Sequence, residues 1–299
     1  MNYDVGVDIG SVSINCVILD ENRRVVLETP YLRHFGLIYE ETRKLLENIL
    51  RRIRGENSGV LRSVSFTGVH GELLAEKLHA PFEVETIAQV MGAIHVAPGV
   101  RTIITVGGQD AAVFQLAHSG DQWRLESFNM NGPCASGTGS FIDQQAERLA
   151  QSIYGPDFSM DQEKLQQTLD DFIELGLKST YPAPVACRCT VFTKSDMIHL
   201  QNKGENLPNI IAGLHFGNAA NYMSTIIGHR ELFDPIIFIG AMASNRLQVQ
   251  AFKHYFPSLT VPPYHTSIGA LGAALQAQKQ NRRNELDLSA FMRRDSHSV

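Results

Sequence analysis

One order of predicted elements occurs twice along this chain, roughly a hundred residues apart. The first copy is a strand at 5–10, a glycine turn, a strand at 13–20 and a third strand at 23–30. The second copy starts near residue 103 and ends with a strand at 122–128. Apolar and β-branched residues between the turns favour sheet. A repeat of this length is too long for a solenoid and predicts two related α/β lobes.

Helices alternate with short strands after each of these strand groups. The expected elements of the first half are a helix near 38–54 and a strand near 61–66. In the second half, a long helix near 205–228 precedes a strand at 236–240, and further helices start near 245 and 267.

A Pro98-Gly99 dipeptide separates the two halves. The sequence therefore predicts a first lobe of residues 1–98, a second lobe of residues 99–280 and a polar, solvated tail at 281–299. Ligands of two-lobed α/β proteins bind in the cleft between the lobes, near the strand ends. The two glycine turns are accordingly expected to face one cleft.

The composition excludes several functional classes. A formal charge of -5 leaves no basic surface for nucleic acid, and no apolar run is long enough to span a membrane. The start, MNYDVGVDIG, lacks the basic region of a signal peptide, so a cytoplasmic protein is expected. Four cysteines in such a chain do not indicate a disulfide framework. In a reducing compartment, grouped cysteines more often bind metal or react.

Three glycine-rich turns suit a nucleotide, because the backbone N–H groups of such turns can approach a phosphate closely. One turn alone could equally be an ordinary hairpin turn. Two turns in register, with a third directly after a strand, resemble the actin/Hsp70/sugar-kinase superfamily. That resemblance implies RNase H-like lobes with two phosphate turns and one adenosine turn, which are Gly10, Ser11, Val12 and Ser13; Gly107 and Gly108; and Gly240, Ala241 and Met242.

Three of the four cysteines lie close to predicted helix starts. Cys134 precedes a helix in the stretch NMNGPCASGTGSF, and unpaired N–H groups at a helix N-terminus favour a thiolate, which is a nucleophile or a metal ligand. Cys187 and Cys189 precede a second helix at 190–201. One Cys-x-Cys pair does not supply the four ligands of structural zinc. Cys16 lies within a strand and is expected to be a buried structural residue.

Over about residues 3–280 the chain resembles the ATP-dependent activators of 2-hydroxyacyl-CoA dehydratases, which are BadF/BadG/BcrA/BcrD-type ATPases related to benzoyl-CoA reductase subunits. The most specific stretches are GPCASGTGSFID, which includes Gly137, Thr138 and Gly139, RCTVFTKSDMIHLQNKG and GALGAAL. The resemblance implies that Cys134 and Cys189 of two chains hold one [4Fe-4S] cluster in a homodimer. Cys187 remains an alternative ligand, a thiol beside the ligands or a surface residue.

The resemblance also implies an activity. The protein would hydrolyse ATP and pass a low-potential electron from reduced ferredoxin or flavodoxin to an iron–sulfur dehydratase or reductase that acts on an acyl-CoA. Asp8 is expected to hold Mg²⁺ through water, and Gln109 or Asp110 to orient the attacking water. ATP binding and hydrolysis would shift the lobes.

Three positions depart from the pattern of that family. Thr105 stands where an Asp is usual, Asn15 where a Lys is frequent and Gln89 where a His is common. These departures leave Asp8, Gln109 and Asp110 as the polar candidates and point to slower hydrolysis. Two alternatives are a small-metabolite kinase on the same fold, with Asp110 as its base, and a nucleotide-binding scaffold without electron transfer.

Overall fold

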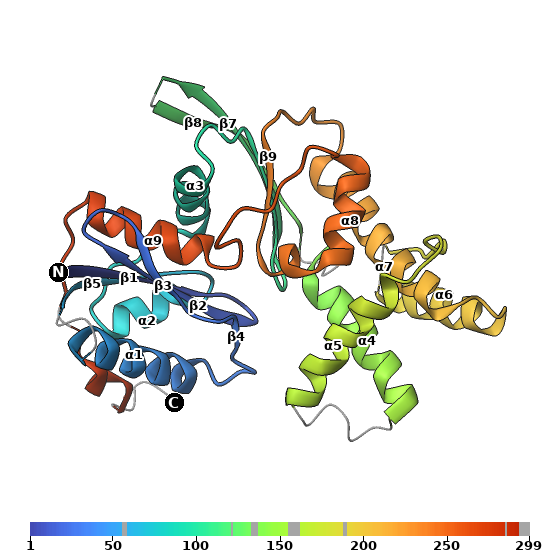
Figure 1. The fold of residues 1–299 in the computed structure, drawn as a ribbon, viewed down its shortest axis with the longest axis horizontal. Helices are drawn as coiled ribbons and strands as arrows, with labels where there is room; N and C mark the ends of the chain where they lie inside the picture. Colours follow the sequence, from blue (N-terminus) through green and yellow to red (C-terminus); the bar gives the residue numbers. More distant parts are fainter. Residues whose placement is uncertain are drawn as a thin grey trace. The chain divides into compact units, whose positions relative to one another are not determined.

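The computed structural model describes residues 1–55, 59–120, 122–132, 137–154, 162–187, 190–284 and 286–292 (Figure 1). It divides into two compact units, which are treated separately below. Unit 1 comprises Met1–Pro98 and Pro263–Val299, and unit 2 comprises Gly99–Pro262. In the part of the chain that is described, none of the helices combines the length and apolar character that a membrane span requires.

Unit 1 is built on a five-stranded sheet in the order β3-β2-β1-β5, in which β4 also pairs with β2. Strand β1, called the middle strand below because it lies between its hairpin partner and a parallel strand, pairs antiparallel with β2 and parallel with β5. Figure 1 shows α1 and α9 on opposite faces of this sheet. The elements of the unit are β1 (Asn2–Ile9), β2 (Ser13–Asp20), β3 (Val25–Glu28), β4 (Leu32–Arg33), α1 (Ile38–Gly55), β5 (Val60–Thr67), α2 (Gly71–Lys77), α3 (Glu85–Val96) and α9 (Ile268–Lys279).

Alternating side chains of β1 face the two layers of unit 1. Val5 and Val7 belong to the apolar cluster that includes Leu46 of α1. On the other face, Gly6 lies directly against the backbone of α9, where a Cβ would overlap the carbonyl oxygen of Ala270. The missing side chain therefore lets α9 approach the sheet closely.

Unit 2 repeats the arrangement around β6, which pairs antiparallel with β7 and parallel with β9. Its strands are β6 (Thr102–Val106), β7 (Ala111–Ser119), β8 (Gln122–Met130) and β9 (Ile236–Ile239). Its helices are α4 (Gly139–Tyr154), α5 (Gln162–Gly176), α6 (Thr190–Asn202), α7 (Leu207–Tyr222) with a π-helical turn at Met223–Ile227, a 3₁₀ turn at Ala241–Ser244, and α8 (Arg246–Tyr255).

The predicted strands and most of the predicted helices are present, but the last helix differs in its assignment. It was expected in the second lobe, whereas α9 belongs to unit 1. It is almost wholly apolar and packs between β1 and α3. Gly92 of α3 and Gly272 of α9 permit the contact between these two helices, because a Cβ at either position would overlap the backbone of the facing helix. Sequence periodicity shows an apolar helix but does not show which sheet it covers.

The C-terminal segment also differs from its prediction as a solvated tail. Leu286, Leu288 and Phe291 pack against the apolar cluster of unit 1 beneath α1. The ring of Phe291 lies edge-on to Tyr39, with centroids 6.5 Å apart. These three apolar side chains are separated by polar ones, so the average composition of the segment concealed them.

The close approach of α9 leads to a stability prediction. Substitution Gly6→Ala forces a Cβ into the backbone of α9 and should lower the free energy of unfolding by about 3 kcal/mol, measured by urea denaturation. Gly55→Ala is the matched control, because a Cβ at Gly55 meets no atom within 4 Å. It should not lower the free energy of unfolding, because Ala has a higher helix propensity than Gly. Equal effects of the two substitutions would contradict the packing described for α9.

Candidate functional site

The two glycine turns have the same closing hydrogen bond. In unit 1 the N–H of Gly10 donates to the carbonyl oxygen of Ser13 at 2.9 Å, and in unit 2 the N–H of Gly107 donates to that of Asp110 at 2.8 Å. Each turn joins the middle strand of its sheet to the next antiparallel strand. The two copies of the repeat therefore share the same backbone hydrogen bond in their glycine turns.

A second pair of glycines follows the parallel strands. Gly68 after β5 and Gly240 after β9 have φ values of +87° and +91°. A Cβ at Gly68 would lie 2.5 Å from the carbonyl oxygen of Ile9, and one at Gly240 would lie 2.5 Å from that of Val106. Both the backbone conformation and the space thus require glycine at these two positions.

Three polar side chains form a row across unit 1, at the strand ends next to the first glycine turn. Asp8 of β1 pairs with Asn15 of β2 on one side and with Thr67 of β5 on the other. Directly paired residues place their side chains on the same face of a sheet. Asn15 Oδ1 and Thr67 Oγ1 are buried and have no hydrogen-bond partner among the described residues. The row thus holds two buried oxygen atoms that are available to a ligand.

Asp8 lies in a space that two glycines leave open. A Cβ at Gly68 would lie 2.5 Å from its Oδ1, and a Cβ at Gly269 of α9 would overlap its Oδ2. Burial, followed by repulsion from the Glu85 carboxylate, raises the pKa of Asp8 from 3.8 to about 8. Gln89 donates to Glu85 Oε1 at 2.8 Å and so contacts the carboxylate that acts on Asp8.

The donor set of this row fits Mg²⁺. Magnesium prefers oxygen ligands, retains several of its waters and binds through one or two carboxylates. Asp8 supplies a carboxylate, and Asn15 and Thr67 each supply a buried oxygen atom that no described residue hydrogen-bonds. A nearby cation would also stabilise the ionised form of Asp8 and so lower its raised pKa.

The equivalent row of unit 2 has a different chemistry. Thr105 occupies the position that corresponds to Asp8, and it pairs with Ala112 and Ile239. Two of these three side chains are apolar. The duplicated scaffold therefore concentrates oxygen ligands in unit 1, next to the first glycine turn.

The second glycine turn contacts the start of α4. The N–H groups of Gly139 and Ser140 donate to the carbonyl oxygens of Gly107 at 2.9 Å and Gly108 at 2.7 Å. A Cβ at Gly139 would lie 3.2 Å from the side chain of Met242. Three of the predicted nucleotide-binding segments of unit 2 therefore meet here.

The remaining predicted nucleotide-binding residues differ in exposure. In unit 1, Gly10, Ser11 and Val12 are half-buried and Ser13 is buried. In unit 2, Gln109 and Asp110 are exposed, Ala241 is half-buried, Thr138 and Met242 are buried, and Gly137 has a φ of +91°.

Both cysteines that the structure describes are buried. Cys16 is fully buried in β2, as predicted. The surface alternative for Cys187 is wrong, because it is 4% exposed and its thiol lies 3.5 Å from the carbonyl oxygen of Leu214. Burial, and then the Asp196 carboxylate, raises the pKa of Cys187 to about 12. The predicted cluster ligands, Cys134 and Cys189, lie outside the described residues.

Two side chains that the sequence analysis did not select brace the glycine turns. Gly36 N–H donates to Nδ1 of His34 at 3.1 Å, so Nε2 carries the proton and donates to the Gly10 carbonyl oxygen at 3.2 Å. Asn131 braces the second turn by donating to the Gln109 carbonyl oxygen at 3.0 Å. Both braces are distant from their turns in sequence, and no local motif marks them.

This geometry defines a class of protein. Two units with the same hairpin, parallel strand and left-handed glycine have the fold of the actin/Hsp70/sugar-kinase superfamily. Solved structures of that class superpose on 91%, 93% and 94% of the chain.

The family follows from the sequence match. The model of the BadF/BadG/BcrA/BcrD ATPase family matches residues 5–277, and the chain belongs to this ATPase family. It is 27% identical to the (R)-2-hydroxyglutaryl-CoA dehydratase activating ATPase of Acidaminococcus fermentans, over 93% of this chain and 98% of that protein. It is 29% identical to the activator of lactoyl-CoA dehydratase of Anaerotignum propionicum, over 92% of this chain and 97% of that protein.

The chain is also similar to a solved structure of a dehydratase activator. The activator of the 2-hydroxyisocaproyl-CoA dehydratase from Clostridium difficile, with bound ADPNP, is 26% identical and has a TM-score of 0.76. The match covers 94% of this chain and 96% of that one.

The raised pKa of Asp8 leads to a prediction for the protein without nucleotide or Mg²⁺. Because the folded-state pKa of about 8 exceeds the ordinary value of 3.8, stability that is present at acid pH is lost as the pH rises towards 8. Asp8→Asn should remove this loss. Urea denaturation should show the variant gaining on the order of 2 kcal/mol over wild type between pH 5.5 and 8.5. A pH-independent difference would contradict the raised pKa.

The brace on the first turn leads to a prediction for nucleotide affinity. His34→Ala removes the bond to Gly10 and should weaken ADP binding about fivefold, since a hydrogen bond contributes about 1 kcal/mol. Calorimetric titration with Mg-ADP measures the change. His95→Ala, at an exposed position of the same unit, is the control and should leave the affinity unchanged. A His34→Ala protein with wild-type affinity would show that the brace does not shape the turn.

Proposed function

We propose that this protein is an ATP-dependent activator that passes a low-potential electron to an iron–sulfur dehydratase or reductase acting on an acyl-CoA. The observation that carries the proposal is the row of Asn15, Asp8 and Thr67 beside the first glycine turn, in which two buried oxygen atoms have no hydrogen-bond partner among the described residues. A site of this kind suits metal-assisted phosphoryl transfer, in which protein groups position the phosphate and the metal. The relatives that are named as dehydratase activators support the nature of the partner.

Different residues of the site would bind the nucleotide and promote its hydrolysis. The backbone of the two glycine turns would bind the phosphates. Asp8 would hold Mg²⁺ through water, and Gln109 or Asp110, both exposed, would orient the attacking water. The adenosine would lie against Gly240 and Ala241, where Met242 packs behind the turn. The bound ATP analogue in the C. difficile activator supports nucleotide binding.

The proposed electron carrier is one [4Fe-4S] cluster held by Cys134 and Cys189 of two chains. Four thiolates complete such a cluster, and when bound it supplies one-electron redox chemistry. The burial of Cys16 and Cys187 supports this choice, because a thiol buried in the core of one unit cannot reach a partner subunit without repacking that core. Reduced ferredoxin or flavodoxin would supply the electron, and hydrolysis would shift the lobes and so change the angle between the cluster-bearing helices.

Iron analysis of cysteine variants tests the proposal. Anaerobically purified protein should contain two irons per chain and be brown, and either Cys134→Ala or Cys189→Ala should lose the iron, because a twofold dimer then loses two of four ligands. Cys187→Ala and Cys16→Ala should retain it, since both thiols are buried within their units.

Two results would contradict the assignment. One is four irons on a monomer, and the other is no iron after anaerobic reconstitution of folded protein. A colourless protein that phosphorylates a small metabolite would instead favour the kinase alternative.

A further inference from the structure

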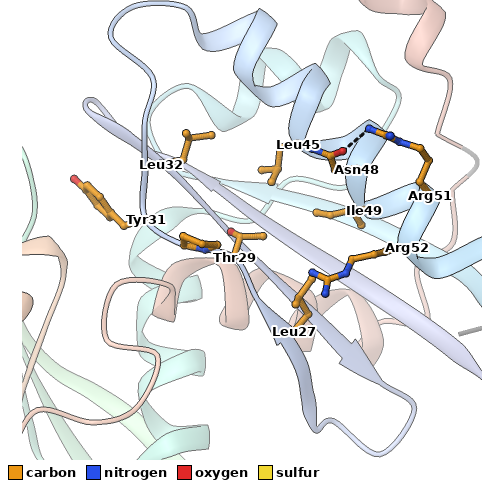
Figure 2. Close-up of a pocket in the computed structure, with 10 residues that line it drawn as sticks. Leu27, Thr29, Tyr31, Leu32, Leu45, Asn48, Ile49, Arg51 and Arg52 are labelled. Atoms are coloured by element: carbon orange, nitrogen blue, oxygen red, sulfur yellow. Dashed lines mark hydrogen bonds between the residues drawn. The ribbon is translucent and has the colours of Figure 1, made fainter. Parts of the chain in front are cut away.

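A cavity of about 590 Å³ lies in unit 1, between the segment that joins β3 to β4 and the helix α1 (Figure 2). This volume falls within the range of small-molecule sites, roughly 300–1,000 Å³. Leu27 and Leu32 line it from the strands, and Leu45 and Ile49 line it from α1. Its floor is therefore aliphatic.

One side of the cavity carries positive charge. Arg51 and Arg52, in the last turns of α1, both line it, and Figure 2 shows Arg52 pointing towards Leu27 while Arg51 turns to Asn48. Arg51 donates to Asn48 Oδ1, and its Nε donates to the carbonyl oxygen of Glu47 at 3.4 Å. Both acceptors are uncharged, so these bonds orient the guanidinium group without neutralising it.

Among the described residues, the two acidic side chains that adjoin lining residues in sequence, Glu28 and Glu47, do not line the cavity. Glu28 follows Leu27 in β3 and, by strand alternation, faces the other side. The carboxylate of Glu47 lies 2.6 Å from Arg43 in an ion pair. The cavity thus combines an aliphatic floor with a cationic edge.

We propose that this cavity is a second ligand site, separate from the glycine turns, for a small molecule with an apolar body and one carboxylate. The aliphatic floor gains free energy by burying an apolar group and loses it by desolvating a polar one, which disfavours sugars and free nucleotides. The cationic edge selects a carboxylate, because Arg pairs with it through two parallel hydrogen bonds.

The position of the cavity connects it to the first glycine turn, which is proposed to bind the phosphates. Leu32 lines the cavity and pairs with Ile14 of β2. Two residues later, His34 donates a hydrogen bond to the carbonyl oxygen of Gly10. A ligand that contacts Leu32 is therefore connected to the first glycine turn by three consecutive residues. This coupling rests on the proposed nucleotide function, whereas the cavity site itself does not.

Calorimetric titration with sodium octanoate tests the site. Octanoate should bind saturably at one site per chain, while acetate, which lacks the apolar body, and 1-octanol, which lacks the charge, should bind at least tenfold more weakly. Leu45→Trp fills the cavity and should abolish binding. Arg51→Gln should weaken binding on the order of tenfold, because charge-assisted hydrogen bonds are lost.

Arg54→Gln is the matched control, since Arg54 is exposed on the same helix and does not line the cavity. It should bind octanoate like wild type. No saturable octanoate binding, or full binding by Leu45→Trp with a wild-type circular dichroism spectrum, would overturn the site.

A titration of Mg-ADP with and without saturating octanoate tests the coupling. By linkage, octanoate should change the ADP affinity by the same factor by which ADP changes the octanoate affinity. Unchanged ADP affinity in protein that binds both would overturn the coupling. Protein that binds octanoate but no ADP would instead overturn the proposed nucleotide function and leave the cavity site in place.

Discussion

Both units depend on one close contact, in which the residue after the parallel strand touches the carbonyl oxygen that ends the middle strand. Gly68 meets Ile9 in unit 1, and Gly240 meets Val106 in unit 2. A side chain at either glycine would push the parallel strand away and separate it from the hairpin. Because the contact sets the spacing of three strand ends, it also sets where their last side chains and the glycine turns lie. The candidate site is a consequence of this backbone arrangement.

The two copies share a backbone and differ in side chains. Asn15, Asp8 and Thr67 form the oxygen-rich row of unit 1, and Ala112, Thr105 and Ile239 occupy the same positions in unit 2. Thr105 thus occupies a position whose neighbours across the sheet are apolar. Asp8 supplies the carboxylate among these six residues. Its burial raises its pKa to about 8, and a bound cation would offset this cost of ionisation. Such a carboxylate couples metal binding to its own ionisation.

The sequence predicted the hairpins and the glycine turns, because these are local patterns, and the role of Asp8 stays a prediction. It noted Asn15 only as a departure from a family pattern, although Asn15 pairs with Asp8 within the predicted hairpin. It missed Thr67 and did not connect Gln89 with Glu85, since the pairing of β1 with β5 and the packing of α3 are long-range and leave no local signal. His34, which lies 24 positions from Gly10, was missed for the same reason. The position of Cys187 beside a second cysteine drew attention to its chemistry, whereas its burial depends on α7, where Gly217 leaves the space for its thiol.

The central claim is that the metal of the ATPase site binds to the row in unit 1 and not to the equivalent row in unit 2. Electron paramagnetic resonance of Mn²⁺, added in place of Mg²⁺ to protein saturated with ADP, measures it directly. The account predicts one bound Mn²⁺ per chain in wild type and in Thr105→Val, and loss of that Mn²⁺ in Asp8→Ala. Retention of Mn²⁺ in Asp8→Ala together with its loss in Thr105→Val would contradict the account.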